Sequence, residues 1–371
     1  MCTGSGKSRV AIMAAMDVIK NNPNANIYLI VPTERLRDVG WEDEFDKWEQ
    51  KEIYDGVYRY CYVSCNKVKN QEIDLVILDE AHNITELRFE FFKNNNVKRV
   101  IALTATIPRD EEKRKMLNEV APVCFEYPLE QGVKDGVVSP YKITVIQTSL
   151  DSNDRYVEAG NKKKRFFQTE EGYYKWLTKV IARMLYSKDK KQKEAAKFQI
   201  LRRTRFIYNL KSKLKAAEIL LEHIIPDYHR TLIFCGSIAQ ALELCDYRYY
   251  SKPNEKKNPK AYKAYKGEES LELFVNEKIN RLSCVNRLNE GHNIPNLDSA
   301  LIVQLNSNEL DLIQRIGRIV RFREGHIADI YIIMCQDTQD EKWTFKALEK
   351  FDSNNIEFVT LKSLKWKLNI S

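Results

Sequence analysis

The sequence alternates short apolar runs with segments of helical periodicity. Consecutive apolar residues recur in NIYLIVP, DLVILDE and VKRVIALTAT, and again in TLIFCG, RLSCVN, SALIVQL and ADIYIIMC. Segments such as SRVAIMAAMDVIKNN, with apolar residues at helical spacing, lie between these runs. Continuous apolar runs separated by helices are typical of parallel strands buried on both faces of a sheet. The pattern predicts an α/β protein of two lobes, each a mostly parallel sheet flanked by helices.

Glycine and proline punctuate the chain in LEQGVKDGVVSPY and divide this pattern in two. We expect a first lobe over residues 1–138 and a second lobe over residues 226–371. Residues 139–225, which contain NKKKRFF and SKDKKQKEAAKFQILRRTRF, are expected to form a basic, helix-rich connection leading into the second lobe. The Tyr- and Lys-rich segment YRYYSKPNEKKNPKAYKAYKGEE is expected to be a loop or an insertion.

Composition indicates a globular protein, with 43% hydrophobic and 30% charged residues among 371. No apolar run reaches the roughly 18 residues that span a bilayer, so we expect no membrane partner. The eight cysteines lie mostly inside apolar runs and lack paired metal-ligand spacing, which favours a reducing, cytoplasmic setting.

Charge is unequally distributed along the chain. Residues 1–138 hold 19 Lys and Arg against 23 Asp and Glu, a net charge of −4, whereas the remainder carries +12. The positive excess favours a polyanionic partner for the second half. From charge alone, a solvated basic surface is an equally good interpretation.

The stretch MCTGSGKS has the character of a phosphate-binding loop. Its glycines permit a tight turn whose backbone N–H groups converge on phosphate oxygens, and a helix beginning there adds its positive dipole end. Lys7 is expected to reach the β- and γ-phosphates, and the Ser8 hydroxyl to ligate Mg²⁺. The nucleotide-binding candidates are therefore Thr3, Gly4, Ser5, Gly6, Lys7 and Ser8. A chance match to this short pattern is the alternative.

Two adjacent acids, Asp79 and Glu80, follow the apolar run DLVIL. Carboxylates at the C-terminal end of a parallel strand lie where open α/β sheets bind ligands. Asp79 is expected to hold Mg²⁺, and Glu80 to orient and polarise the attacking water. The alternative interpretation is a surface turn after a strand.

A third candidate element is LIQRIGRIVRFREG, near the end of the second lobe. If this segment is helical, Arg318 and Arg321 lie at positions i and i+3 on one face, which Gln314 shares. Guanidinium groups in this arrangement suit a γ-phosphate through their bidentate geometry. A basic amphipathic helix on the surface is the alternative.

Taken together and in this order, the motifs resemble those of the superfamily 2 helicases and translocases over nearly the whole chain. CTGSGKS is similar to motif I, IVPTERL with the following Trp to motif Ia, DEAH to motif II and LTATIP to motif III. TLIFCGS resembles motif IV, LNEGHNIPN motif V and QRIGRIVR motif VI. Among these proteins, the chain looks most like DNA-repair, restriction-type and phage-encoded members.

The resemblance implies two RecA-like lobes, ATP and Mg²⁺ as cofactors, and an ATPase stimulated by nucleic acid. ATP hydrolysis at the lobe interface would drive movement along a strand, with single-stranded DNA or duplex DNA junctions preferred and RNA as the alternative. Thr104 and Thr106 would couple hydrolysis to movement, and Gly291 would sense nucleotide and strand. Asn293 stands where many members carry Asp, which leaves its coupling role open. A phage-encoded protein would act in the host cytoplasm.

The position of the phosphate-binding loop raises a further expectation. In the family, a strand launches this loop, and no such strand precedes residue 3 in this sequence. We therefore expect lobe one to lack one strand, which an upstream segment or a partner chain would supply. Without it, the alternative function is a nucleic-acid-binding protein with an impaired ATPase.

Overall fold

The computed structural model describes residues 1–2, 4–108, 110–161, 164–256, 259–263, 265–285, 294, 296–305 and 309–370. The chain forms two compact units. Unit 1 comprises Met1–Pro140, Leu288–Ile294 and Ile313–His326, as far as these residues are described. Unit 2 comprises Tyr141–Arg287, Pro295–Leu312 and Ile327–Ser371, again as far as these residues are described. Among the described residues, no helix has the length and apolar character needed to cross a membrane.

Unit 1 is built on a four-stranded parallel sheet with the order β2-β1-β4-β6. Its strands are β1 (Ile27–Val31), β2 (Tyr58–Cys61), β4 (Leu75–Leu78) and β6 (Val100–Ala102), and a separate short pair is formed by β3 (Glu72–Ile73) and β5 (Asn96–Val97). Its helices are α1 (Lys7–Asn21), α2 (Trp41–Lys47), α3 (Lys51–Asp55), α4 (Glu86–Lys93), α5 (Glu111–Val120) and α6 (Leu129–Lys134).

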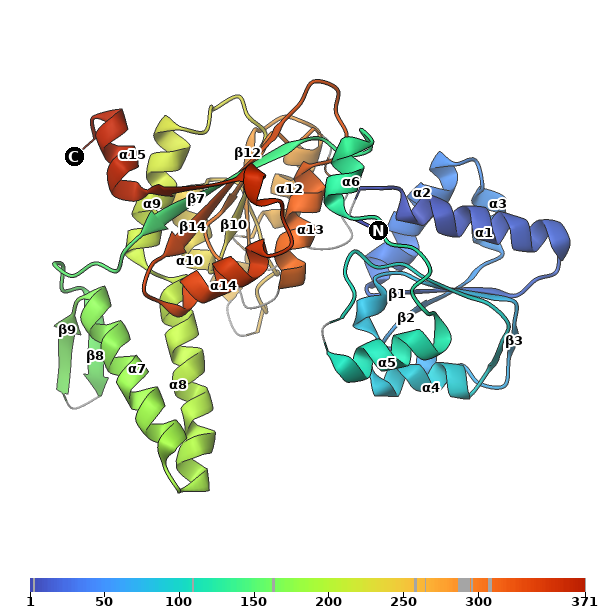
Figure 1. Cartoon of the computed structure of the whole chain (residues 1–371), viewed down its shortest axis with the longest axis horizontal. Coiled ribbons are helices and arrows are strands. Elements are labelled where there is room, and N and C mark those ends of the chain that lie inside the picture. The colour runs from blue at the N-terminus through green and yellow to red at the C-terminus, as the bar shows by residue number, and fades with distance from the viewer. Residues whose placement is uncertain are drawn as a thin grey trace. The chain divides into compact units, whose positions relative to one another are not determined.

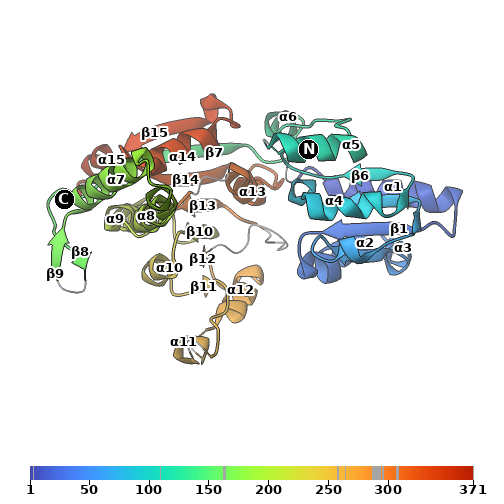
Figure 2. The same ribbon diagram turned by 90° about the horizontal axis from the view of Figure 1, so that it is seen from below.

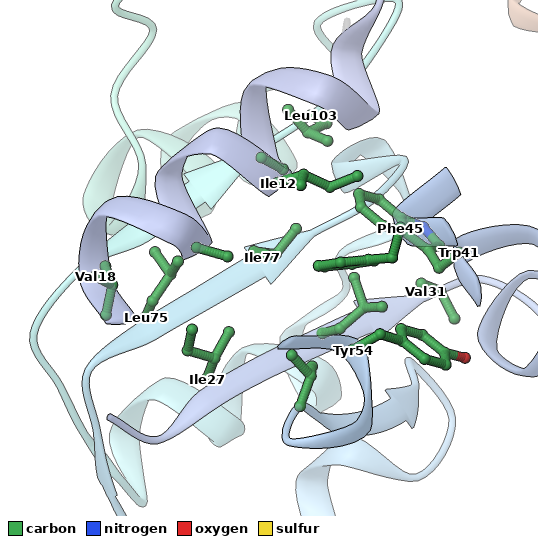
Figure 3. Packing of buried hydrophobic residues seen from close by; sticks show 14 of the residues in the cluster. Ile12, Val18, Ile27, Val31, Trp41, Phe45, Tyr54, Leu75, Ile77 and Leu103 are labelled. Carbon is green, nitrogen blue, oxygen red and sulfur yellow. The ribbon is translucent and has the colours of Figure 1, made fainter. Parts of the chain in front are cut away.

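Both faces of the inner strands β1 and β4 are buried, as the continuous apolar runs predict. Ile27, Leu29 and Val31 of β1 point to the side of α1, α2 and α3, where they pack with Ile12, Phe45 and other residues of one cluster (Figure 3). Alternate residues of the same strand, Tyr28 and Ile30, pack with residues of α4 and α5 in a second cluster. The period of two along a strand therefore places every β1 side chain in a core.

β6 is an edge strand of this sheet in the described part of the chain. Its three residues are half-buried, whereas those of β1 and β4 are all buried.

Unit 2 contains a seven-stranded sheet with the order β11-β12-β10-β13-β14-β7-β15, and all the neighbouring strands pair in parallel (Figure 2). The strands are β7 (Tyr141–Thr148), β10 (Thr231–Cys235), β11 (Arg248–Tyr249), β12 (Arg281–Val285), β13 (Ser299–Ile302), β14 (Ala328–Cys335) and β15 (Ile356–Thr360). The helix directly before β10 is α9 (Lys211–His223), and the helices after it are α10 (Ile238–Leu244), α11 (Pro259–Lys263), α12 (Gly267–Val275), α13 (Glu309–Ile319), α14 (Gln339–Leu348) and α15 (Leu361–Leu368). Of α13, the part from Ile313 onwards belongs to unit 1. Residues of α9, α10 and α15 pack on the sheet in the main core cluster of this unit.

Between β7 and α9, unit 2 carries two hairpins. β8 (Val157–Asn161) and β9 (Lys164–Gln168) pair antiparallel, and α7 (Glu170–Tyr186) packs along α8 (Lys190–Tyr208). Thr169 and Asp189 cap the two helices by accepting hydrogen bonds from the Gly172 and Lys191 N–H groups, at 3.1 and 2.9 Å. Figure 1 shows α7 and α8 extending away from the sheet.

The predicted α/β architecture with mostly parallel sheets is confirmed, and each apolar run forms the expected strand. The segment expected to be a connection, residues 139–225, contains β7, which lies inside the sheet of unit 2 between β14 and β15. The compact units divide after Pro140. The Tyr- and Lys-rich segment contains β11, α11 and the beginning of α12.

Candidate nucleotide-binding site

The loop that precedes α1 has the backbone conformation of a phosphate-binding turn. Gly4 and Gly6 both adopt left-handed φ angles of 83°, which glycine reaches without the steric cost that a Cβ brings. Gly6 is the N-cap residue of α1 and has no side chain with which to cap the helix. The first backbone N–H groups of α1 and the positive end of its dipole are therefore presented by a tight glycine turn.

The polar side chains of the loop fold back onto it. Ser5 Oγ and Lys7 Nζ both donate hydrogen bonds to the Cys2 carbonyl oxygen, at 2.8 and 3.1 Å. Cys2 N donates to the carbonyl oxygen of Tyr127 at 2.8 Å, which ties the loop to the segment before α6. Lys7 therefore holds its ammonium group inside the loop.

Asp79 directly follows β4, and its carboxylate is held by two hydrogen bonds. Trp41 Nε1 donates to Oδ2 and Glu80 N to Oδ1, each at 2.9 Å. Burial raises the pKa of Asp79, while the Trp41 hydrogen bond, the Lys7 ammonium and the Glu80 N–H lower it. Lys7 thus favours the charged form of Asp79 electrostatically.

Trp41 is a partner of this site that the sequence analysis did not single out. It begins α2, 38 residues before Asp79, and its side chain is buried. The only signal in the sequence was its place after IVPTERL in the segment that resembles motif Ia. Tyr62 contributes as well, because its hydroxyl donates to the Asp79 carbonyl oxygen at 3.0 Å.

Glu80 adopts an unusual backbone conformation. Its φ angle of 46° lies in the left-handed region, which non-glycine residues enter at an energetic cost and which is often found at functional sites. Its Oε2 lies 3.4 Å from His82 Nδ1, and the Glu80 side chain is 14% exposed. The turn after β4 therefore points the second acid in a fixed direction beside Asp79.

Hydrogen bonds join the segment that resembles motif II to the one that resembles motif III. His82 Nδ1 lies 3.2 Å from Thr104 Oγ1, and the Ala81 N–H donates to the Leu103 carbonyl at 2.9 Å. Thr104 Oγ1 in turn donates to the Thr106 carbonyl at 2.7 Å. The two predicted coupling residues are therefore neighbours of the turn that carries Asp79 and Glu80.

The segment containing Gln314, Arg318 and Arg321 belongs to unit 1 from Ile313 onwards. Gln314 and Arg318 are buried, at 4% and 8% exposure. A Cβ placed on Gly4 would lie 3.8 Å from the Gly317 carbonyl oxygen and 3.9 Å from Arg321 Cγ, so this segment runs beside the glycine turn. Burial lowers the pKa of Arg321, while Glu44 raises it.

The expectation that Arg318 and Arg321 share one face of a helix is wrong. α13 ends at Ile319, and Arg321 forms an isolated antiparallel bridge with Val138. The Ser139 N–H donates to the Val320 carbonyl at 2.8 Å, so pairing with a distant extended segment ends the helix before Arg321. Two other predicted site residues, Thr3 and Gly291, lie outside the described residues, as does Asn293.

The described residues fit a nucleoside triphosphate with its magnesium ion. The glycine turn and the uncapped beginning of α1 suit phosphate oxygens, and the Lys7 ammonium suits their charge. The Asp79 carboxylate and the Ser8 hydroxyl in the first turn of α1 offer oxygen ligands of the kind that Mg²⁺ prefers. Burial raises the pKa of Asp79, and Lys7 opposes this rise, which favours the charged form of the carboxyl group.

Comparison with known proteins shows similarity to helicases. Residues 215–323 match the family model described as "Helicase conserved C-terminal domain". The chain is 23% identical over 372 residues to "Putative helicase 22" of Sulfolobus islandicus filamentous virus (isolate Iceland/Hveragerdi). This similarity covers 88% of the chain but 59% of the viral protein, so the chain spans little more than half the length of that relative.

Solved structures share the fold at low sequence identity. The type ISP restriction-modification enzyme LlaBIII bound to DNA has a TM-score of 0.59 at 14% identity, over 99% of this chain and 30% of the enzyme. The Hef helicase domain of Pyrococcus furiosus has a TM-score of 0.50 at 14% identity, over 94% of both chains. Dbp5 of S. cerevisiae, bound to RNA and ADP BeF3, has a TM-score of 0.55 at 12% identity, over 100% of this chain and 86% of Dbp5.

The expected fold of RecA-like lobes, each with a mostly parallel sheet flanked by helices, is therefore confirmed. In sequence and in fold, the chain is thus similar to helicases.

Proposed function

We propose that the chain is an ATP-dependent nucleic-acid motor, a helicase or a translocase that acts on DNA. The observation that supports this most directly is the arrangement around Asp79 in unit 1. Asp79 and Glu80 lie in the turn after β4, and His82 of the same segment contacts Thr104. The glycine turn supplies Lys7, which interacts electrostatically with Asp79. Such a set of groups suits the binding and hydrolysis of a nucleoside triphosphate.

In this proposal, the backbone N–H groups around Gly4 and Gly6 bind phosphate oxygens, and Lys7 neutralises their charge. Ser8 and Asp79 hold Mg²⁺. When bound, MgATP supplies the phosphoanhydride bond whose cleavage releases free energy. Glu80 orients and polarises water, since its carboxylate is the nearest acid to Asp79 in the chain and is held by the turn after β4.

We assign Gln314, Arg318 and Arg321 to the γ-phosphate, because their segment runs beside the glycine turn. Thr104 and Thr106 couple hydrolysis to movement, which their hydrogen bonds with the motif II segment support. Gly291 keeps its proposed role as a sensor of nucleotide and strand. DNA is chosen over RNA because the sequence looks most like DNA-repair and restriction-type members of the superfamily.

We also propose that the edge of the unit 1 sheet at β6 accepts one more strand, from an upstream segment or a partner chain. Support comes from the half-buried state of Val100, Ile101 and Ala102 in a sheet whose inner strands are fully buried. Supplying a short apolar strand before residue 3 should raise ATP turnover by the chain. Unchanged turnover would refute the idea.

Steady-state ATP turnover tests the proposed function, measured without nucleic acid, with single-stranded DNA and with single-stranded RNA. We expect turnover to be stimulated by DNA more than by RNA. Turnover that is absent with both would favour the alternative of a nucleic-acid-binding protein with an impaired ATPase. Stimulation by RNA alone would favour an RNA helicase. Strand displacement from partial duplexes with either overhang then separates a helicase from a translocase or clamp.

A further inference from the structure

The region between β7 and α9 projects from unit 2 as an arm, defined here as residues 151–210 (Figure 1). It contains the β8–β9 hairpin and the α7–α8 hairpin. The arm holds 16 Lys and Arg against 7 Asp and Glu, a net charge of +9, while the whole chain has +8. The positive charge of this protein is therefore concentrated in the arm, and the rest of the chain is close to neutral.

The arm is fixed to unit 2 at its base. Tyr174 of α7 packs in a buried cluster with Ile207, Leu210 and Cys335, and its hydroxyl accepts a hydrogen bond from the Gln339 N–H at 2.8 Å. The buried Glu170 carboxylate accepts from the N–H groups of Asp151 and Ser212, at 2.9 and 3.2 Å. These contacts hold the two helices in one orientation relative to the sheet, so the faces that they expose form a defined surface.

The exposed face of α8 mixes aromatic and basic side chains. Phe198 is 74% exposed at the middle of this face. At 3.6 residues per turn, Lys191, Arg202 and Arg205 lie within about 40° of Phe198 around the helix axis, as does Glu194, the single acid of α8. An exposed ring therefore stands among three cationic groups on one face.

α7 repeats this pattern. Trp176 and Tyr186 are 40% and 90% exposed, and Lys179 and Arg183 lie between them on the same face at spacings of three and four residues. The Arg202 guanidinium of α8 lies 5.6 Å from the Trp176 ring centroid, so the exposed faces of the two helices meet there.

The cations on these faces lack carboxylate partners in the described part of the chain, although the Arg202 guanidinium lies over the Tyr173 and Trp176 rings. Among the described residues of the arm, ion pairs join Arg165 to Glu158 and Lys175 to Glu171. Within the described ranges, none of the basic residues that line the two faces forms an ion pair: Lys179, Arg183, Lys191, Arg202 and Arg205.

A hollow at the base of the arm also combines aromatic and basic side chains. It has a volume of about 630 Å³ and is lined by Arg155, Phe166 and Phe167, among other residues. Phe166 and Phe167 of β9 are 44% and 59% exposed. Rings beside a cation are thus found from the base of the arm to the end of α7.

The interleaving of rings and cations identifies the class of partner. A helix that lies on a membrane separates an apolar face from a basic face, whereas here both kinds of side chain share one face. A single-stranded nucleic acid offers phosphates and unpaired bases in alternation, and proteins bind it with basic grooves and aromatic stacking platforms. A duplex would leave the exposed rings without bases on which to stack.

We propose that the outward faces of α7 and α8 form a binding surface for single-stranded DNA, outside the nucleotide-binding site. Phosphates contact Lys191, Arg202 and Arg205, and bases stack on Trp176, Tyr186 and Phe198. The choice of DNA over RNA rests on the proposed function, but binding by the arm does not require ATP turnover.

The first test compares two triple variants of the full chain. Lys191→Gln/Arg202→Gln/Arg205→Gln removes three cations from the arm, and Lys278→Gln/Lys350→Gln/Lys362→Gln removes three exposed cations elsewhere in unit 2. Binding of fluorescent oligothymidylate is measured by anisotropy over a salt series without nucleotide. Because each phosphate contact on a single strand contributes about 0.7 to the slope of log K against log salt, the arm variant should lose about two units of slope. The control should keep the wild-type slope.

The second test separates stacking from apolar contact. Phe198→Ala should weaken binding of the same oligonucleotide by about tenfold, which is within the range for loss of one base–aromatic stack. Phe198→Leu keeps most of the apolar volume but has no aromatic face, so it should weaken binding nearly as much. Full binding by Phe198→Leu would contradict stacking.

Equal losses in the arm variant and the control variant would overturn the proposal, since binding would then follow overall charge. The proposal is also overturned if the arm variant keeps its affinity for the DNA but loses affinity for an RNA oligonucleotide, for anionic phospholipid vesicles or for polyglutamate. ATP turnover by the wild-type chain is measured in parallel and decides the proposed motor function separately. A chain without turnover whose arm variant loses DNA binding would refute the motor and support the arm.

Discussion

Lys213→Met should destabilise unit 2 by about 3 kcal/mol, because it leaves a buried carboxylate without its cation. Lys213 of α9 and Asp340 of α14 are both fully buried, and Lys213 Nζ lies 2.8 Å from Asp340 Oδ2. Lys213 Nζ also donates to Gln304 Oε1 at 2.8 Å. The pair therefore joins α9, α14 and the segment after β13.

The expected loss of stability depends on the hydrogen bonds that Asp340 keeps after the substitution. Breaking a buried ion pair by removing one partner costs about 3–5 kcal/mol. Asp340 keeps two donors, the Cys335 N–H at 2.8 Å and Gln304 Nε2 at 3.0 Å, so the lower end of this range is expected. Methionine is similar in length to the lysine stem, which keeps the cavity cost small.

Hydrogen exchange of peptides that cover β14 measures this change, because the amides of central strands report on the stability of their unit. A loss of 3 kcal/mol corresponds to roughly 100-fold faster exchange. Lys142→Met is the matched control: its ion pair with Glu357 has the same 2.8 Å distance, but both side chains are about half exposed. An exposed pair contributes about 0–1 kcal/mol.

Lys213→Met/Asp340→Asn should regain much of the lost stability, because the amide is neutral and keeps an oxygen that can accept from Cys335 N–H. If Lys213→Met accelerates exchange no more than Lys142→Met, the reasoning from burial is refuted. A double variant less stable than Lys213→Met would refute it as well.

Further predictions concern the nucleotide site. Arg318→Ala and Arg321→Ala should each lower kcat for ATP hydrolysis by on the order of 10³ or more. DNA affinity measured without nucleotide should change little. Lost DNA affinity with normal ATP turnover would instead assign these residues to DNA binding. Trp41→Phe should raise the Mg²⁺ concentration for half-maximal turnover by about tenfold or more, because it removes the hydrogen bond to Asp79. An unchanged Mg²⁺ dependence would contradict that role.

The sequence predicted those elements whose formation depends on a few neighbouring residues. The five residues of β1 are apolar without interruption, and the glycine turn and α1 follow directly from GSGKS. Asp79 and Glu80 were placed correctly after β4 because parallel strands carry their functional residues at their C-terminal ends.

Contacts between distant segments could not be read from the sequence. β7 was assigned to a connection, since its neighbour β14 lies almost 190 residues further along the chain. Arg321 was placed on a helix because the helical pattern continues past Ile319, and the competing bridge to Val138 has no local signal. The Trp41 side chain reaches Asp79 across 38 residues, a pairing that neither residue's surroundings predict.

The most direct test of the central claim is steady-state ATP turnover by Glu80→Gln, measured with saturating single-stranded DNA and compared with the wild type. The substitution keeps the size of the side chain and removes the charge that we propose polarises water, while Lys7, Ser8 and Asp79 stay in place. Turnover should fall by about 10²–10⁴-fold, the usual contribution of a positioned general base, and binding of a fluorescent ATP analogue should stay within a few-fold of wild type. Glu86→Gln, an exposed acid of α4, is the control and should leave turnover unchanged. Near-normal hydrolysis by Glu80→Gln would contradict the assignment of this turn as the catalytic centre.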